Sequence, residues 1–189
     1  MYTNSPEEIF SRISQGIAGI DWLRHEVDAE LLLKALILAP TDHICIVLCD
    51  VLGWRHERIA VSHLITLLEH ESSKVRSAAA DALAKIGDPS AGTALLKRLE
   101  LPDPNIGVRR MLLAALGAVK CQEAIPLLIE YLQNPDPSQR GSASWSLGIM
   151  HVNEALPALE DALQREPSQY PKERMTEAIR AIRTANFLK

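Results

Sequence analysis

Apolar residues recur at helical spacing along most of the chain. One apolar stripe runs through Val75, Ala79, Ala82, Leu83 and Ile86, and a second runs through Ala91, Leu95 and Leu99. Steps of three and four residues place such positions on one face of an α-helix. The pattern therefore predicts two consecutive amphipathic helices, and no strand pattern of similar strength competes with them.

A stop and a restart separate these two helices. In the stretch GDP, Gly87 can take the left-handed conformation that ends a helix, Asp88 can cap the next helix, and Pro89 suits its first turn. Proline-containing breaks at residues 101–105 and 134–138 separate one helix pair from the next.

The helix pair is repeated along the chain. Leu95 recurs as Leu128 after 33 residues and as Leu159 after a further 31, and the same pattern extends back by 31 residues to Leu64. A fixed spacing of this kind is the signature of a tandem repeat array. The expected units cover approximately residues 5–40, 41–71, 72–103, 104–135 and 136–166.

The fold class follows from the size of one unit. A single pair of short helices cannot bury its apolar stripe alone, so neighbouring pairs bury it against each other. The sequence predicts an all-α fold, a right-handed superhelical α-solenoid of about five helix pairs forming one domain over residues 1–189. Ser5, Pro6 and Glu8 form a capping-box arrangement at its start, and an amphipathic capping helix over residues 170–186 closes it.

Composition and charge narrow the class of partner. The chain is 47% hydrophobic and 23% charged, typical of a globular protein, and its net charge of −4 gives no general attraction to phosphate backbones. Nucleic acid is therefore disfavoured as a partner. The cysteines Cys45, Cys49 and Cys121 cannot all pair within the chain, and no segment has the pattern of a secretory signal or a bilayer-spanning helix. These features predict a cytoplasmic protein with no membrane partner.

The repeat also carries a recognisable motif. The first helix follows V-R-x-x-A-x-x-A-L from Val75 to Leu83, a glycine ends it, and the second helix contains A-[IL]-P-x-L, as in Ala124–Leu128. This pattern resembles the short HEAT-like repeats found in phycobilin lyase subunits, over roughly residues 41–165. The resemblance implies a scaffold or binding role, with bilin attachment or detachment as one family activity. It carries over no catalytic motif.

The outward faces of the second helices predict a partner-binding surface. In HEAT-like solenoids these helices line the concave side, so the residues opposite the apolar stripe should point into a groove. They are Thr66, Thr93, Lys97, Glu123, Glu130, Glu154 and Asp161. An acidic lining in the later half would attract a basic segment of a partner protein. The alternative is a solvated acidic face with no ligand, and both interpretations stay open.

Two further features belong to the first helices. Trp145 stands where other units have polar or small residues, and is either an exposed anchor for a partner or covered by the closing helix. Arg76, Arg109 and Arg140 share one repeat position. Guanidinium groups in a row can bind phosphates or carboxylates, but we favour a structural ladder that ties each helix start to its neighbour.

No reaction centre is predicted. His43, Cys45 and Cys49 fall short of the four ligands of a tetrahedral metal site, and buried thiols are the better interpretation. His63 and His70 have no nucleophile or metal motif to act with. We therefore predict no catalytic residue, no metal and no cofactor, although enzymatic activity stays open.

The leading hypothesis is a non-enzymatic adaptor, inhibitor or assembly factor that binds a protein segment in its groove. The first alternative, from the resemblance, is a bilin lyase-type or bilin-handling subunit acting on phycobiliproteins. The second is a helical-repeat protein that binds nucleic acid, which the net charge opposes.

Overall fold

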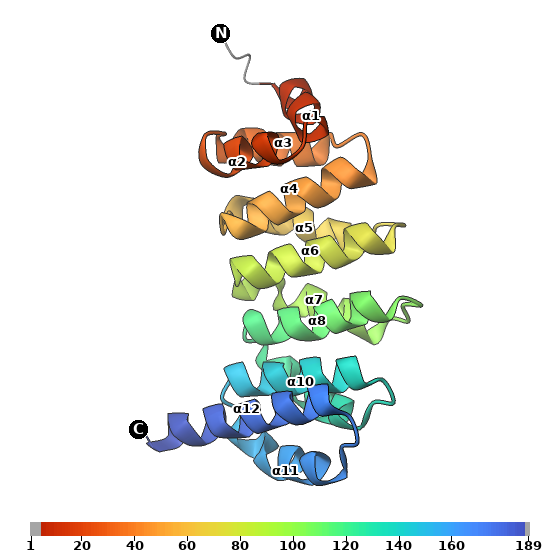
Figure 1. Cartoon of the computed structure of the whole chain (residues 1–189), viewed down its shortest axis with the longest axis vertical. Coiled ribbons are helices and arrows are strands. Elements are labelled where there is room, and N and C mark those ends of the chain that lie inside the picture. Colours follow the sequence, from red (N-terminus) through yellow and green to blue (C-terminus); the bar gives the residue numbers. More distant parts are fainter. Residues whose placement is uncertain (1–4, 188–189) are drawn as a thin grey trace. The chain divides into compact units, whose positions relative to one another are not determined.

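The computed structural model of the chain describes residues 5–187, and for residues 17 and 18 the backbone only. Every regular element within this range is helical (Figure 1), which confirms the predicted fold class. The elements fall into two compact units, Met1–Ala91 and Gly92–Lys189.

Unit 1 begins with three helices where the later repeats have two. Its described elements are α1 (Pro6–Ser14), α2 (Ile17–His25), α3 (Ala29–Ile37), α4 (Asp42–Trp54), the short 3-10 turn η1 (Arg58–Ala60), α5 (Val61–Leu67), α6 (Ser73–Ile86) and η2 (Pro89–Ala91). Gly16, with φ of 88°, separates α1 from α2, because this backbone conformation ends a helix. The Ser5 half of the predicted capping box is confirmed, since the Ser5 hydroxyl accepts a hydrogen bond from the Glu8 amide at 3.4 Å, whereas the Glu8 carboxylate pairs with Arg12 at 3.3 Å.

Unit 2 continues the alternation of first and second helices to the closing helix. Its described elements are α7 (Gly92–Glu100), α8 (Ile106–Ala118), η3 (Gln122–Ala124), α9 (Ile125–Glu130), η4 (Tyr131–Gln133), α10 (Pro137–Ile149), η5 (Asn153–Ala155), α11 (Leu156–Arg165) and α12 (Gln169–Phe187).

The first helices stack directly on one another within each unit. In unit 1 α4 packs against α6, and in unit 2 α10 packs between α8 and α12 (Figure 1). Glycine allows this close approach in unit 2. A Cβ on Gly117 would lie 2.5 Å from the Ser146 Cβ, and a Cβ on Gly148 would lie 2.8 Å from the Ala178 Cα. Both distances are well inside a normal carbon–carbon contact.

Each second helix packs against the first helix that follows it. The pairs are α5 with α6, α7 with α8, α9 with α10, and α11 with α12. The repeated leucines of the second helices lie in the core: Leu64, Leu95, Leu128 and Leu159 all have an exposed fraction of 0%. The inward face predicted from the repeat spacing is therefore confirmed.

The first helices end on a left-handed residue at one repeat position. Gly87 has φ of 69°, as its place in the sequence predicts. At the equivalent position of other repeats, His56, Lys120 and His151 have φ of 54°, 56° and 54°. Left-handed backbone is unusual for residues with a side chain, so the repeat geometry imposes this conformation on whichever residue occupies the position.

Candidate partner-binding surface

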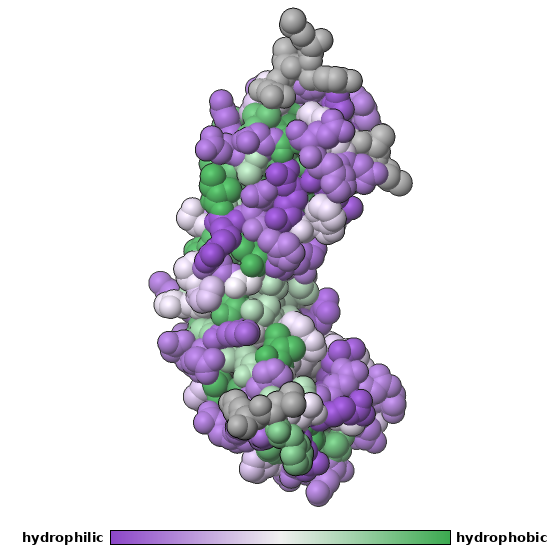
Figure 2. All heavy atoms as spheres, turned by 90° about the vertical axis from the view of Figure 1, so that its left-hand side faces the viewer, coloured by the Kyte–Doolittle hydropathy of each residue, from purple (hydrophilic) through white to green (hydrophobic). Residues whose placement is uncertain are grey.

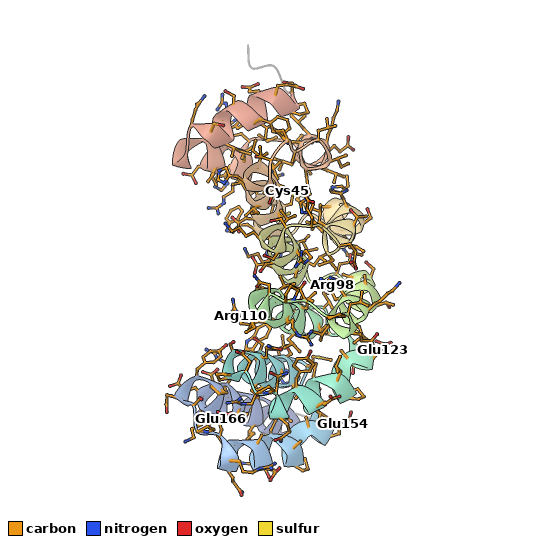
Figure 3. All side chains as sticks on the ribbon, turned by 90° about the vertical axis from the view of Figure 1, so that its right-hand side faces the viewer. Cys45, Arg98, Arg110, Glu123, Glu154 and Glu166 are labelled. Carbon is orange, nitrogen blue, oxygen red and sulfur yellow. The ribbon has the colours of Figure 1, made fainter. Side chains whose placement is uncertain are left out.

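The second helices of unit 2 expose a row of polar and charged side chains. The exposed residues on this row are Thr93 and Lys97 of α7, Glu123 of η3, Glu130 of α9, Glu154 of η5 and Asp161 of α11. Figure 3 shows the side chains of Glu123 and Glu154 on the same side of unit 2. We call this set of six residues the second-helix row.

The buried side of each second helix determines which residues face outward. Glu123 and Glu154 lie in the turns η3 and η5, directly before the fully buried Ala124 and Ala155. Leu128 anchors α9 in the core. Because an α-helix turns by roughly 100° per residue, Glu130 points away from the core that holds Leu128.

The carboxylates of this row differ in their partners. Asp161 forms an ion pair with Arg165, one helical turn further along α11. Glu123 accepts a long 3.4 Å hydrogen bond from the Cys121 thiol. Within the described residues, Glu123, Glu130 and Glu154 have no ion-pair partner, so the row carries negative charge that unit 2 leaves uncompensated there.

Thr66, the remaining polar candidate, lies in unit 1. It is exposed on α5, and its hydroxyl donates a hydrogen bond of 2.7 Å to the His63 carbonyl. The side chain is therefore accessible, but its hydroxyl already has an acceptor within the helix.

Trp145 lies in the first-helix layer of unit 2 and is half-buried. It sits on the face of α10 that also carries Gly141 and Gly148, four and three residues away. Those glycines lie against Tyr170 and Ala178 of α12. The closing helix therefore packs against the face of α10 that holds the indole.

Two of the three ladder arginines bind the end of the preceding repeat. A terminal nitrogen of Arg76 donates to the carbonyls of His70 and Glu71, both at 2.8 Å. In the same way, Arg140 donates to the carbonyls of Asn134 and Pro135 at 2.8 and 3.0 Å. These carbonyls lie five and six residues before the arginine in both repeats. Each contact therefore joins the start of a first helix to the loop that precedes it.

Arg109 differs from the other two. Its guanidinium donates to the Tyr131 hydroxyl and lies 5.8 Å from the centre of that ring. This contact joins the start of α8 to η4 within unit 2.

Two buried carboxylates form ion pairs that the repeat pattern does not predict. Glu166 forms two hydrogen bonds of 2.6 Å with Arg140, and Asp103 forms an ion pair with Arg98. The Arg140 guanidinium lowers the pKa of Glu166. Asp103 lies within the break at residues 101–105 that the proline pattern predicts. Nothing in the sequence links Glu166 to an arginine 26 residues earlier.

The described residues contain no cluster of three or more His, Cys, Asp or Glu placed to hold a metal ion.

Cys45 and Cys49 lie one turn apart on α4, and both are buried. The hydrogen bond between the two thiols lowers the pKa of Cys45 and raises that of Cys49, which burial raises further. Burial also raises the pKa of Cys121, which disfavours its thiolate.

None of the helices in residues 5–187 has the length and apolar character needed to cross a lipid bilayer. This finding agrees with the apolar runs of the sequence, which are short and interrupted by charge.

Similar solved structures are helical-repeat proteins. The complex of CpcE and CpcF of phycocyanin lyase from Nostoc sp. PCC7120 matches with a TM-score of 0.66 and 19% identity, over 80% of this chain and 99% of that chain. A designed armadillo repeat protein matches with a TM-score of 0.57 and 20% identity, over 94% of this chain and 87% of its own. Another designed armadillo repeat protein, in complex with the peptide (KR)4, matches with a TM-score of 0.53 and 18% identity over the same shares.

These likenesses show that the chain has an α-solenoid fold, as predicted. No curated protein matches it by sequence. The family model for HEAT repeats matches residues 29–106 and 93–180, which together make up most of the chain. The chain belongs to the HEAT-repeat family.

Proposed function

We propose that this protein is a non-enzymatic binding module that holds a basic segment of a partner protein against the second-helix row of unit 2. It would act as an adaptor, inhibitor or assembly factor. The observation that carries the proposal is the set of exposed glutamates Glu123, Glu130 and Glu154, which have no ion-pair partner within the described residues.

Charge supports a basic ligand. Exposed carboxylates that lack local counter-charges attract a cationic segment, raise its association rate and disfavour acidic competitors. Lys97 is the one positive member of the row and lies at its α7 end. A bound basic segment would therefore place its cationic residues towards η3, α9 and η5.

Proteins of similar fold support a peptide or protein ligand. One designed armadillo repeat protein was solved in complex with the peptide (KR)4, and CpcE was solved in complex with CpcF. The first of these pairs a helical-repeat solenoid with alternating lysine and arginine, which is the ligand chemistry that the second-helix row favours.

The test uses a fluorescein-labelled (KR)4 peptide and the full chain, with binding followed by fluorescence anisotropy. We expect binding that weakens steeply as NaCl rises from about 0.05 M to about 0.5 M, because exposed charges are screened over this range. The triple variant Glu123→Lys, Glu130→Lys and Glu154→Lys should lose affinity by about tenfold or more.

A matched variant separates local charge from net charge. Glu26, Glu71 and Glu173 are exposed outside the row, and changing these three to Lys alters the net charge by the same amount. This control should keep most of the affinity for the peptide. Equal losses in both triple variants would mean that only the net charge attracts the peptide, and the proposal would fail.

A second candidate function is the handling of a bilin. Its support is the fold shared with the phycocyanin lyase complex, together with the short HEAT-like motif of the sequence. Mixing the chain with phycocyanobilin, with and without a phycobiliprotein, should produce a shifted absorbance band. An unchanged spectrum in both mixtures would remove this candidate.

We place the protein in the cytoplasm. All three cysteines are free and buried, as expected in a reducing compartment. Cell fractionation followed by immunoblotting would test this location.

A further inference from the structure

The second-helix layer of unit 2 ends at an open pocket. The pocket lies between α11 and α12 and has a volume of about 570 Å³. Leu163 of α11 lines it, with Ile179, Arg180, Arg183 and Phe187 of α12. In Figure 1 the last turns of α12 extend past the neighbouring helices α10 and α11 of this unit.

Leu163 stands at a repeat position that is closed elsewhere. Its equivalents Leu68, Leu99 and Leu132 are only 2%, 1% and 2% exposed, whereas Leu163 is half-buried. In the inner repeats the next second-helix element covers this position: η2 packs against α5, η3 packs against α7, and α11 packs against η4. Within the described residues, no second-layer element follows α11. The pocket is therefore the place where the repeat pattern puts one more helical segment.

In the first-helix layer of unit 2, α12 has an arginine where α8 and α10 have glycine. Ser146 lies against Gly117, and Ala178 lies against Gly148. Ser146 and Ala178 are therefore equivalent positions of α10 and α12. Two residues after each of them, α10 has Gly148 and α12 has Arg180. Arg180 thus stands where α8 and α10 have the glycine that admits the next first helix. Another first helix therefore cannot pack there as closely as α10 packs against α8.

The charge of the pocket selects the segment that would fit. Arg183 is paired with Glu160 at 2.6 Å. Arg180 is exposed and forms no ion pair with any residue between 5 and 187. Phe187 is 90% exposed, and Figure 2, which faces this end of α12, shows hydrophobic surface among hydrophilic residues there. The pocket thus offers an apolar floor and one uncompensated positive charge.

We infer that this pocket is a docking site for an amphipathic, acidic helix of a partner protein. The apolar stripe of that helix would cover Leu163 and Phe187, in the way that the next repeat covers Leu99 and Leu132. An acidic residue beside the stripe would pair with Arg180. None of the pocket residues named above belongs to the second-helix row, and the pocket prefers the opposite charge. The two proposals can therefore be tested independently.

The test uses two fluorescein-labelled peptides and the full chain. Both are alanine-rich, carry a leucine at every third or fourth position, and have about 16 residues, near the length at which an isolated helix becomes populated in water. One has glutamates beside the leucines and the other has lysines. Anisotropy titrations should show the acidic peptide binding more tightly by about tenfold.

Three variants locate the binding. Arg180→Glu should weaken the acidic peptide by about tenfold and strengthen the basic one, because an attraction becomes a repulsion. Phe187→Ser should weaken the acidic peptide by removing apolar contact. Arg110→Glu is the matched control, because Arg110 is exposed on α8 (Figure 3) and does not line the pocket. It should leave the affinity within about twofold. Circular dichroism would establish that each variant is folded.

Three results would overturn the inference. Equal affinity for the two peptides, or an equal effect of Arg180→Glu and Arg110→Glu, would mean that the pocket does not select an acidic helix. A dimer seen by light scattering that Phe187→Ser dissociates would mean that a second copy of the chain covers the pocket. A failure of the (KR)4 experiment would leave these measurements unchanged, since that peptide tests the opposite charge.

Discussion

The guanidinium of Arg140 and the carboxylate of Glu166 form two hydrogen bonds of 2.6 Å each, which join the start of α10 to the loop between α11 and α12. The Glu166 side chain is 2% exposed and that of Arg140 is 13% exposed. The same arginine also donates to two loop carbonyls. One side chain therefore connects three segments of unit 2.

Removing one partner of this ion pair should destabilise the protein. Arg140→Gln leaves the Glu166 carboxylate buried without its counter-charge, and we expect the free energy of unfolding to fall by about 3 kcal/mol. Urea denaturation followed by circular dichroism would measure the change. Arg165→Gln, which breaks the exposed pair with Asp161, is the control and should cost less than about 1 kcal/mol. Similar losses in the two variants would contradict this account of the buried pair.

The pH dependence of stability should report on the same pair. The hydrogen bonds from Arg140 hold the native pKa of Glu166 below its ordinary value of 4.5. A lowered native pKa contributes stability above the unfolded-state pKa, and this contribution is lost as the pH falls through the native pKa. The free energy of unfolding should therefore decrease below pH 4.5, and Glu166→Gln should decrease less over that window. Parallel curves for the two proteins would refute this prediction.

Glycine at a left-handed position should stabilise the protein. Lys120 ends α8 with φ of 56°, a conformation that a side chain disfavours and that glycine adopts freely. Lys120→Gly should raise the free energy of unfolding by about 0.5–1 kcal/mol, after the entropy that glycine adds to the unfolded chain is counted. Gly87→Ala, at the equivalent position of unit 1, should lower it by about 1 kcal/mol. Thermal melts of both variants measure the effect, and shifts of the same sign would contradict it.

A single methyl group should disturb the stacking of α8 on α10. Gly117→Ala would place its Cβ 2.5 Å from the Ser146 Cβ, so the helices must separate. Alanine favours a helix over glycine by about 1 kcal/mol, yet we expect a net loss of about 2 kcal/mol from overpacking. Gly107→Ala, in the first turn of α8 and away from Ser146, is the comparison variant: its Cβ would lie 2.9 Å from the Oδ1 of the capping residue Asn105, a side chain that can shift, so a smaller loss is expected. Chemical denaturation in which Gly117→Ala proves neutral would show that the two helices separate without cost.

The sequence predicted the layers of the fold well because the repeat spacing is directly visible in it. Leu64, Leu95, Leu128 and Leu159 recur at nearly constant intervals, and burial of one such position implies burial of the others. The same periodicity places Glu123 and Glu130 on the outside. When a position has the same surroundings in every repeat, the spacing of apolar residues is enough to predict whether its side chain faces the core.

Other features depend on backbone conformation or on distant contacts. The left-handed conformation of His56 and His151 has no sequence signal, because glycine is the residue that marks such positions. The pairing of Glu166 with Arg140 spans 26 residues and arises only when α10, α11 and α12 are packed. By contrast, the pairing of Asp161 with Arg165 follows an ordinary spacing of four residues and was readable from the sequence.

The arginine contacts with the preceding loops bear on how such arrays change in length. Arg76 and Arg140 each bind carbonyls only five and six residues earlier in the chain. Each contact crosses the boundary between two repeats, and its acceptors are backbone carbonyls, which a preceding repeat supplies whatever its side chains. Recombination can therefore lengthen or shorten the array while such a junction keeps its arginine contact. An added repeat needs no new side-chain pairing at that junction.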